Sequence, residues 1–216
     1  MMFGITLLPV DRLIVAGLWL AAGLTVAGAP SRAADSDWPC IQRKVQTLTA
    51  AQMWDGPEVD NLTGWQDDAE MTALIKLVVS RATPMDRATE RVEVWAKSQP
   101  EPQRDEKLKL LFAGSLKAIN DDRAVILNGI ERFQRRQREL ADRIQDQGAR
   151  LSALHARPPA DDKEKAELAA AEERYKWDAR FFAERQESLP LACEIPVQIE
   201  QRAFDLAREI RLLMKE

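Results

Sequence analysis

The chain has 216 residues, of which 45% are hydrophobic and 31% are charged, and its formal net charge is −4. A nucleic-acid-binding protein normally carries a basic face and a positive balance, so this composition argues against a nucleic-acid partner. The chain has 9 glycines and a high charge fraction, which favours long helices over β-sheets.

An uncharged apolar run covers residues 13–27, with Arg12 before it and small residues at Ala33 and Ala34 after it. This is the pattern of a secretory signal peptide, and we assign residues 1–34 to it. The alternative is an uncleaved anchor, since a run of this length can cross a bilayer when it is extended by its flanks. We favour cleavage because the run is short. The remaining chain is then an exported protein, which we expect in the periplasm rather than secreted or anchored in the membrane.

Two cysteines, Cys40 and Cys193, both follow the signal. In an oxidising compartment an even, isolated pair predicts a disulfide. Closing a loop of roughly 150 residues would stabilise the fold by about 5 kcal/mol on the chain-entropy model. The alternative, a free reactive thiol, is disfavoured by export.

The first helices are predicted by capping signals and periodicity. Thr49 and Gln52 match a capping box, which predicts a short helix ended by the glycine and proline that follow. Residues 55–66 form an acidic loop with turn residues. Apolar residues at three- and four-residue spacing then predict helices over 67–82 and 84–98.

Residues 102–155 are predicted to form one amphipathic helix, far longer than the ~11–12 residues typical of globular proteins. Its second half carries a narrow apolar stripe at Ile126, Ile130, Phe133, Leu140, Ile144, Leu151 and Leu154. Such a stripe is stable only against a partner helix. The break at residues 157–161 and the helical pattern over 162–187 supply that partner.

Equal rise along the two helices predicts which residues face each other. With the turn at the proline pair, the expected neighbours are Leu151 with Leu168, Ile144 with Tyr175, and Phe133 with Phe182 and Arg185. Trp177 should lean inward, while Asp178 should face solvent or pair with Arg143. Pro190 and Pro196 predict a bend, after which a last amphipathic helix begins at residue 197.

These elements predict an all-α fold, in which a small helical-bundle body carries a long antiparallel, coiled-coil-like hairpin arm. We expect a single domain over residues 35–216. The body comprises residues 35–125 and 190–216, and the arm comprises residues 126–189. Polar residues on the predicted seam, namely Gln137, Gln147, Asp178 and Arg185, leave the two-helix packing incomplete, which favours a partner or self-association.

The N-terminal half is rich in tryptophan, and Trp54, Trp65 and Trp95, together with Asp55, mark a possible ligand or partner region. The rings could line a small-ligand pocket or fill gaps in a helical core, and we favour the core. We expect Trp95 to be buried against the preceding helix. The acidic loop also offers oxygen ligands for Ca²⁺, although its spacing does not match an EF-hand.

The only histidine, His155, falls at the hairpin tip beside Arg157, Pro158 and Pro159. Zinc centres and nucleophile triads hold histidine within a shell of partners, which a tip does not offer. We therefore assign no catalytic residue, cofactor or metal ligand, and we expect a protein that is not an enzyme.

The interpretation that follows is an exported helical protein with a non-catalytic interaction or accessory role in the cell envelope. Its partner would be another envelope or exported protein, or a second copy of itself, and it would touch the membrane only through an unprocessed signal. The alternative is a periplasmic protein that binds a small ligand or Ca²⁺ through the tryptophan-rich, acidic N-terminal half.

Overall fold

The computed structural model describes residues 37–215, so the predicted signal peptide over residues 1–34 lies outside the described residues. Within residues 37–215 all regular structure is helical, which confirms the all-α fold. The elements are α1 (Ala50–Met53), the 3-10 helix η1 (Trp65–Asp67), α2 (Ala69–Val79), α3 (Met85–Ser98), α4 (Glu101–His155) and α5 (Asp162–Leu212). No helix in this part of the chain is both long enough and apolar enough to cross a bilayer.

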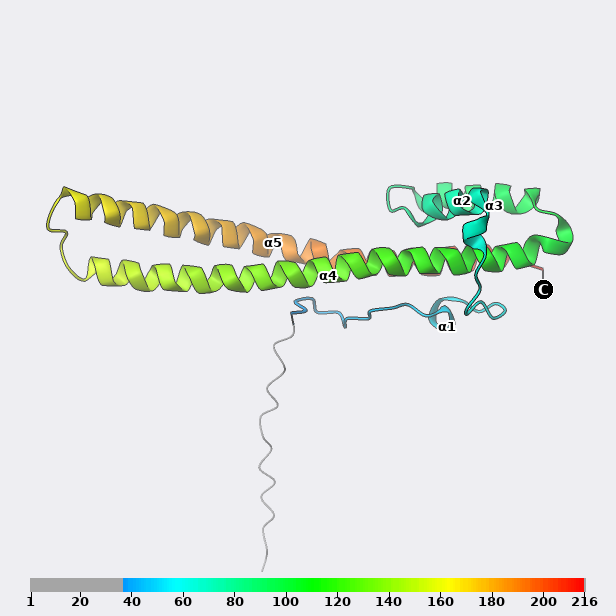
Figure 1. Cartoon of the computed structure of the whole chain (residues 1–216), viewed down its shortest axis with the longest axis horizontal. Helices are drawn as coiled ribbons and strands as arrows, with labels where there is room; N and C mark the ends of the chain where they lie inside the picture. The colour runs from blue at the N-terminus through cyan, green and yellow to red at the C-terminus, as the bar shows by residue number, and fades with distance from the viewer. Residues whose placement is uncertain (1–36, 216) are drawn as a thin grey trace, which may run out of the picture. The chain divides into compact units, whose positions relative to one another are not determined.

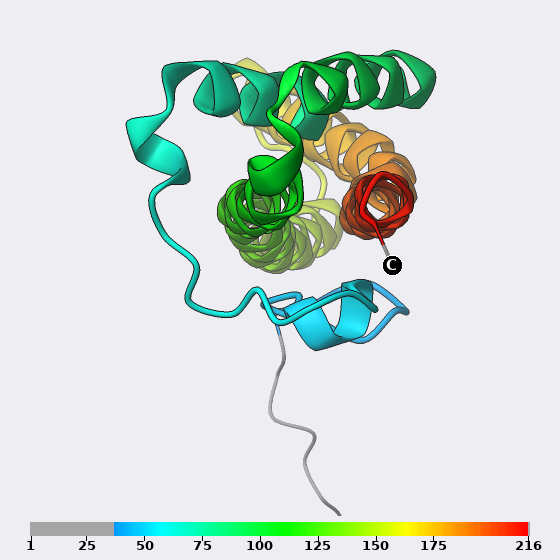
Figure 2. The same cartoon turned by 90° about the vertical axis from the view of Figure 1, so that its right-hand side faces the viewer.

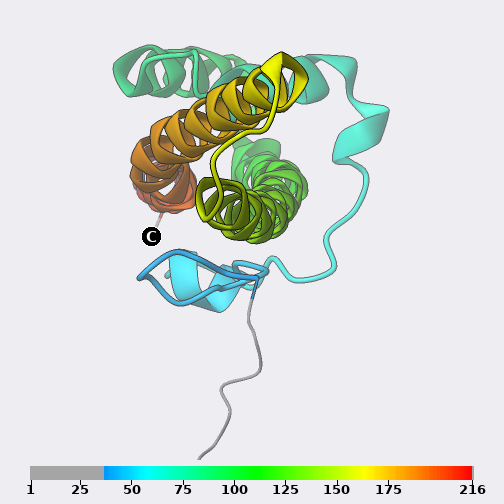
Figure 3. The same cartoon turned by 90° about the vertical axis from the view of Figure 1, so that its left-hand side faces the viewer.

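Helices α4 and α5 run antiparallel and form the middle of three layers (Figure 1). Seen along the hairpin, α2 and α3 cover one side of this pair, while α1 and the residues before it lie on the opposite side (Figure 2). The loop that contains η1 passes around α4 and joins the two outer layers. The view from the turn shows the same order of layers, with the α4–α5 turn in front (Figure 3).

The hydrophobic core lies where α2 and α3 meet the hairpin. Its largest buried side chains come from α2, α3, α4 and α5 and include Met71, Val78, Val92, Leu108, Leu111, Phe112, Leu206 and Ile210. Gly114 allows α2 and η1 to pack closely against α4, because a Cβ at this position would lie 2.5 Å from Ile75 Cδ1 and 2.9 Å from the Trp65 ring. Asp68 caps α2 by accepting a hydrogen bond from the Met71 N–H at 3.0 Å.

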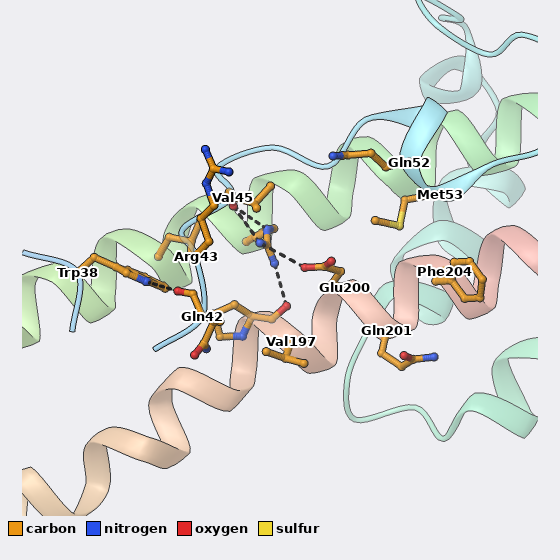
Figure 4. A pocket seen from close by; sticks show the side chains of 13 residues that line it. Trp38, Gln42, Arg43, Val45, Gln52, Met53, Val197, Glu200, Gln201 and Phe204 are labelled. Carbon is orange, nitrogen blue, oxygen red and sulfur yellow. Dashed lines mark hydrogen bonds and ion pairs between the residues drawn. The ribbon is translucent and has the colours of Figure 1, made fainter. Parts of the chain in front are cut away.

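The predicted bend before a separate last helix is wrong, because α5 is one helix that contains both Pro190 and Pro196. A proline inside a helix removes one backbone donor and kinks the axis. Figure 4 shows α5 changing direction close to Val197. The carbonyl groups beside the kink find tertiary donors: Pro196 O accepts from Arg123 Nη1 at 2.8 Å, and Cys193 O accepts from the Gln42 amide. These contacts join the kinked part of α5 to α4 and to the residues before α1.

The antiparallel hairpin is confirmed, and its register follows the prediction most closely near the base of the arm. The Arg185 guanidinium lies 4.9 Å from the centre of the Phe133 ring, as expected. Towards the tip, Tyr175 lies beside Gly148, one helical turn beyond Ile144. The contacts there are therefore displaced by about one turn towards the tip.

Candidate interaction surfaces

Residues 37–49 form an extended segment, called the strap here, that lies across α4 and α5. The predicted disulfide between Cys40 and Cys193 is confirmed, with the two Cα atoms 5.6 Å apart. It links the strap covalently to α5 across a sequence separation of 153 residues. The strap is therefore a fixed wall of the molecule and not a loose terminus.

Polar contacts hold the strap along α4. The Asp37 carboxylate pairs with Arg135, at 2.7 Å, and with Arg138. At the other end, the side-chain amide of Asn120 accepts from the Leu48 N–H and donates to the Leu48 carbonyl, each at 2.9 Å. One amide thus satisfies both backbone groups of a residue that has no strand partner.

Arg123 joins three elements at one point. Its side chain is 3% exposed, and it donates from α4 to the Val45 carbonyl of the strap, at 2.9 and 3.2 Å, and to Pro196 O of α5, at 2.8 Å. Its Nη2 also lies 3.6 Å from the Glu200 carboxylate. Burial lowers the pKa of Arg123, and the charge of Glu200 opposes this shift. This buried guanidinium fixes the strap relative to the kink in α5.

A recess of about 480 Å³ opens between the strap, α1 and α5, over Arg123 (Figure 4). A second recess of about 560 Å³ lies beside the disulfide. The two recesses share Gln42 and Val197 in their walls, and the pair is called the strap groove here. It follows α5 from Gln186 to Phe204.

Large apolar side chains are exposed in the strap groove. Ile41 on the strap is fully exposed, and Val197 and Phe204 on α5 are about half exposed. Pro39, Leu189, Pro190 and both cysteines line the part beside the disulfide. A contiguous exposed apolar surface on a folded protein commonly marks an interaction site.

The three tryptophans named from the sequence do not converge. Trp54 is buried and stacks on Phe112 with ring centroids 4.5 Å apart, and Trp95 is buried in the core that α2 and α3 share. Trp65 is partly buried beside α4, and Asp55 is exposed. None of the recesses described here has more than one of these rings in its wall.

At the hairpin tip, His155 Nε2 lies 2.9 Å from Glu172 Oε1. Arg157 and Pro158 are exposed, whereas Pro159 is partly buried and lines a small recess. Among residues 37–215, no group of three histidine, cysteine, aspartate or glutamate side chains is arranged to hold a metal ion.

The outer face of the arm differs from the prediction. Trp177 does not lean inward, since it is 63% exposed, while its neighbour Asp178 is 9% exposed. The predicted pairing of Asp178 is confirmed, because it accepts from Arg143 Nε at 3.1 Å, and it also accepts from Gln147 Nε2 at 2.8 Å. These hydrogen bonds, that from Gln147 first, lower the pKa of Asp178. The seam thus accommodates an aspartate through a polar network, and the tryptophan faces outward.

The sequence prediction missed Arg123, Asn120 and the strap groove. One signal was present: Arg123 lies four residues after Ile119 and four before Leu127, in register with buried apolar positions. A charge at such a position requires buried partners. The backbone acceptors that satisfy it come from distant segments, so the pattern alone did not identify them.

Comparisons of the chain with models of known protein families, with curated proteins and with solved structures found no match. Its function is therefore inferred from its own residues and geometry.

Proposed function

We propose that this chain is an exported, non-catalytic interaction protein of the cell envelope, and that its hairpin arm engages another envelope protein. The observation that carries the proposal is the placement of Trp177 and Asp178 on α5. A buried polar group and an exposed large apolar group are the informative exceptions to ordinary burial, and here they are adjacent in sequence.

The placement does not serve the stability of the isolated hairpin. A rotation of α5 that brought Trp177 into the seam would bury a large aromatic surface and return Asp178 to water. The chain instead satisfies Asp178 with Arg143 and Gln147. Phe181, one turn along α5 from Trp177, is also exposed. The outer face of α5 therefore presents two aromatic rings to solvent.

Arginines hold these rings in place. The Arg180 guanidinium lies 5.6 Å from the Trp177 ring centre, and that of Arg185 lies 5.1 Å from the Phe181 ring centre. Tryptophan and arginine are enriched among the residues that dominate binding energy at protein interfaces. Rings that are already ordered lose less conformational entropy on binding. Export is supported by the signal-like N-terminal pattern and by the disulfide, which suits an oxidising compartment.

Site-specific photocrosslinking in the native host tests the proposal. A benzophenone amino acid replaces Trp177 in one strain and Val94, an exposed residue of α3, in a control strain. We expect an adduct with one envelope protein from position 177 and none from position 94. With that partner purified, Trp177→Ala should raise the Kd about tenfold or more, as for a central aromatic contact, without changing the melting temperature. Equal crosslinking from both positions, or an unchanged Kd, would refute the role of the arm.

A small-ligand function is the second candidate, favoured by one recess. A depression of about 310 Å³ between α2 and α3 is lined by Trp95, Leu74, Glu70 and Arg91, among others. The Trp95 indole N–H is buried without a hydrogen-bond partner among the described residues. A thermal-shift screen with metabolites and divalent ions separates the candidates, since a native-state ligand raises the midpoint. A shift that Arg91→Ala abolishes would support this function.

A further inference from the structure

The C-terminal part of α5 has one face that no other described element covers. Seen along the hairpin, α4 lies on one side of this helix, α2 and α3 lie above it, and the strap with α1 lies below it (Figure 2). Five exposed residues follow one another on the remaining side at steps of three and four, which places them on one helix face. They are Glu194, Val197, Gln201, Phe204 and Arg208, called the α5 stripe here.

The centre of the α5 stripe is apolar. Val197 is 51% exposed and Phe204 is 47% exposed, and they lie about one helical turn before and after Gln201. Leu212, about three turns after Gln201 on the same face, is also exposed. Apolar residues that recur on one face of a helix pack well against a second helix. The α5 stripe therefore fits a helical partner.

The charges of the α5 stripe are divided about Gln201. Glu194 lies seven residues before this glutamine, and Arg208 lies seven residues after it. Among residues 37–215, Glu194 has no ion-pair partner, and Arg208 pairs only with Asp205 and Glu209 beside it on α5, at 3.7 and 3.3 Å. A helix face with an acidic and a basic end is complementary to a copy of itself that runs in the opposite direction.

The charges also fix the orientation and register of such a pair. With Gln201 at the two-fold axis, facing residues have numbers that sum to about 402, given equal rise on both helices. Glu194 then faces Arg208 of the second copy, and Val197 lies against Phe204 of the second copy. A parallel pair would place glutamate opposite glutamate and arginine opposite arginine, which is unfavourable.

We propose that the α5 stripe is a homodimer interface, in which two copies of the chain pair antiparallel about a two-fold axis at Gln201. Because the two α5 helices run in opposite directions, the two arms extend to opposite ends of the dimer. Trp177 lies 17 residues before Glu194, which corresponds to roughly 25 Å at 1.5 Å per residue. The outer face of the arm is therefore a separate surface and stays open in the dimer.

Sedimentation equilibrium of the full, disulfide-bonded protein over about 1–300 µM tests the proposal. We expect a reversible equilibrium between monomer and dimer. Phe204→Asp should raise the dimer Kd about tenfold or more, because the symmetry places the new charge in the apolar centre twice. Val125→Asp adds the same charge to an exposed position of α4 and should leave the Kd within about twofold.

A charge reversal tests the register. Glu194→Arg should raise the dimer Kd about tenfold, because it faces Arg208 of the second copy at both symmetric contacts. Arg208→Glu should have the same effect, and the double variant should return the Kd to within about threefold of the parent value. A merely structural role of either residue does not produce this rescue. Both residues are exposed, so all variants should melt together with the parent by circular dichroism.

Three results would overturn the proposal. The first is a protein that sediments as a monomer at every concentration. The second is a dimer that Phe204→Asp leaves intact, or one that the double charge reversal fails to restore. The third is a dimer that Trp177→Ala dissociates, because the second copy would then contact the arm and not the α5 stripe.

Discussion

The two halves of the hairpin contain the same two helices, yet they differ in how completely they bury their side chains. On α4, the buried residues lie between Leu108 and Leu140, and α2 and the strap contact this part of the helix. None of residues 141–177, which make up the distal arm, is buried. Two paired helices each cover one stripe of the other, so a side chain between them stays exposed to solvent on one side. The distal arm therefore contains no buried apolar side chain.

This difference predicts two levels of stability in one continuous pair of helices. The distal arm lacks the buried apolar contacts that give a region high local stability. The layered part contains the core, the disulfide and the buried Arg123. Changes in the layered part should therefore affect global unfolding, and changes in the distal arm should affect local opening only.

The largest effect should come from removing the disulfide. Replacing Cys40 and Cys193 by serine together releases a loop of 153 residues, and the chain-entropy model gives a loss of about 5 kcal/mol. Urea unfolding measures the change, with the oxidised parent as reference. A loss below about 1 kcal/mol would show that the noncovalent strap contacts suffice to hold the strap.

The next effect concerns the core that α2 and α3 share. Trp95→Ala should lower the free energy of unfolding by about 3–5 kcal/mol, because a buried aromatic side chain leaves a cavity. Val94→Ala truncates an exposed side chain on the same helix and should change the free energy of unfolding by less than about 0.5 kcal/mol. If both variants unfold alike, the ring of Trp95 does not contribute to the core.

A local effect is expected in the distal arm. Ile144→Asp places a charge on the seam and should splay the arm without unfolding the layered part. Hydrogen exchange should accelerate over residues 145–175 and stay slow in α2 and α3. Val125→Asp, on an exposed face of α4, serves as the control and should change neither region. Simultaneous loss of protection everywhere would mean that the hairpin opens as one unit.

The smallest effect should be a pH dependence confined to the arm. Hydrogen bonds from Gln147 and Arg143 lower the pKa of Asp178 in the folded state. These hydrogen bonds stabilise the folded arm fully above the ordinary aspartate pKa of about 3.9. The stabilisation is lost as the pH falls through the lower pKa that Asp178 has in the folded state. Exchange in the arm should therefore accelerate below about pH 4. Asp178→Asn should remove this dependence, and an unchanged profile in that variant would assign it to another group.

The sequence predicted the features that depend on local pattern. Apolar periodicity predicted the helices, the break at residues 157–161 predicted the hairpin turn, and the isolated cysteine pair predicted the disulfide. The predictions failed at positions whose structure depends on contacts with residues far away in the sequence. Pro190 and Pro196 do not end α5, and the groups that contact this part of the helix, Gln42 and Arg123, come from the strap and from α4. The pairing of Asp178 with Arg143 was predicted, but the outward position of Trp177 and the second partner of Asp178, Gln147, were not.

The order in which the chain is delivered gives the disulfide a further consequence. A chain exported amino terminus first presents Cys40 early, while Cys193 follows 153 residues later. Under the proposed export, Cys40 would be an unpaired thiol throughout that interval and could attack the disulfides of other proteins. The strap docks on two helices that are completed only late in the same delivery. Under the same proposal, correct oxidation would wait for the hairpin to assemble, and a thiol oxidoreductase that protects or reshuffles Cys40 would set the rate of maturation.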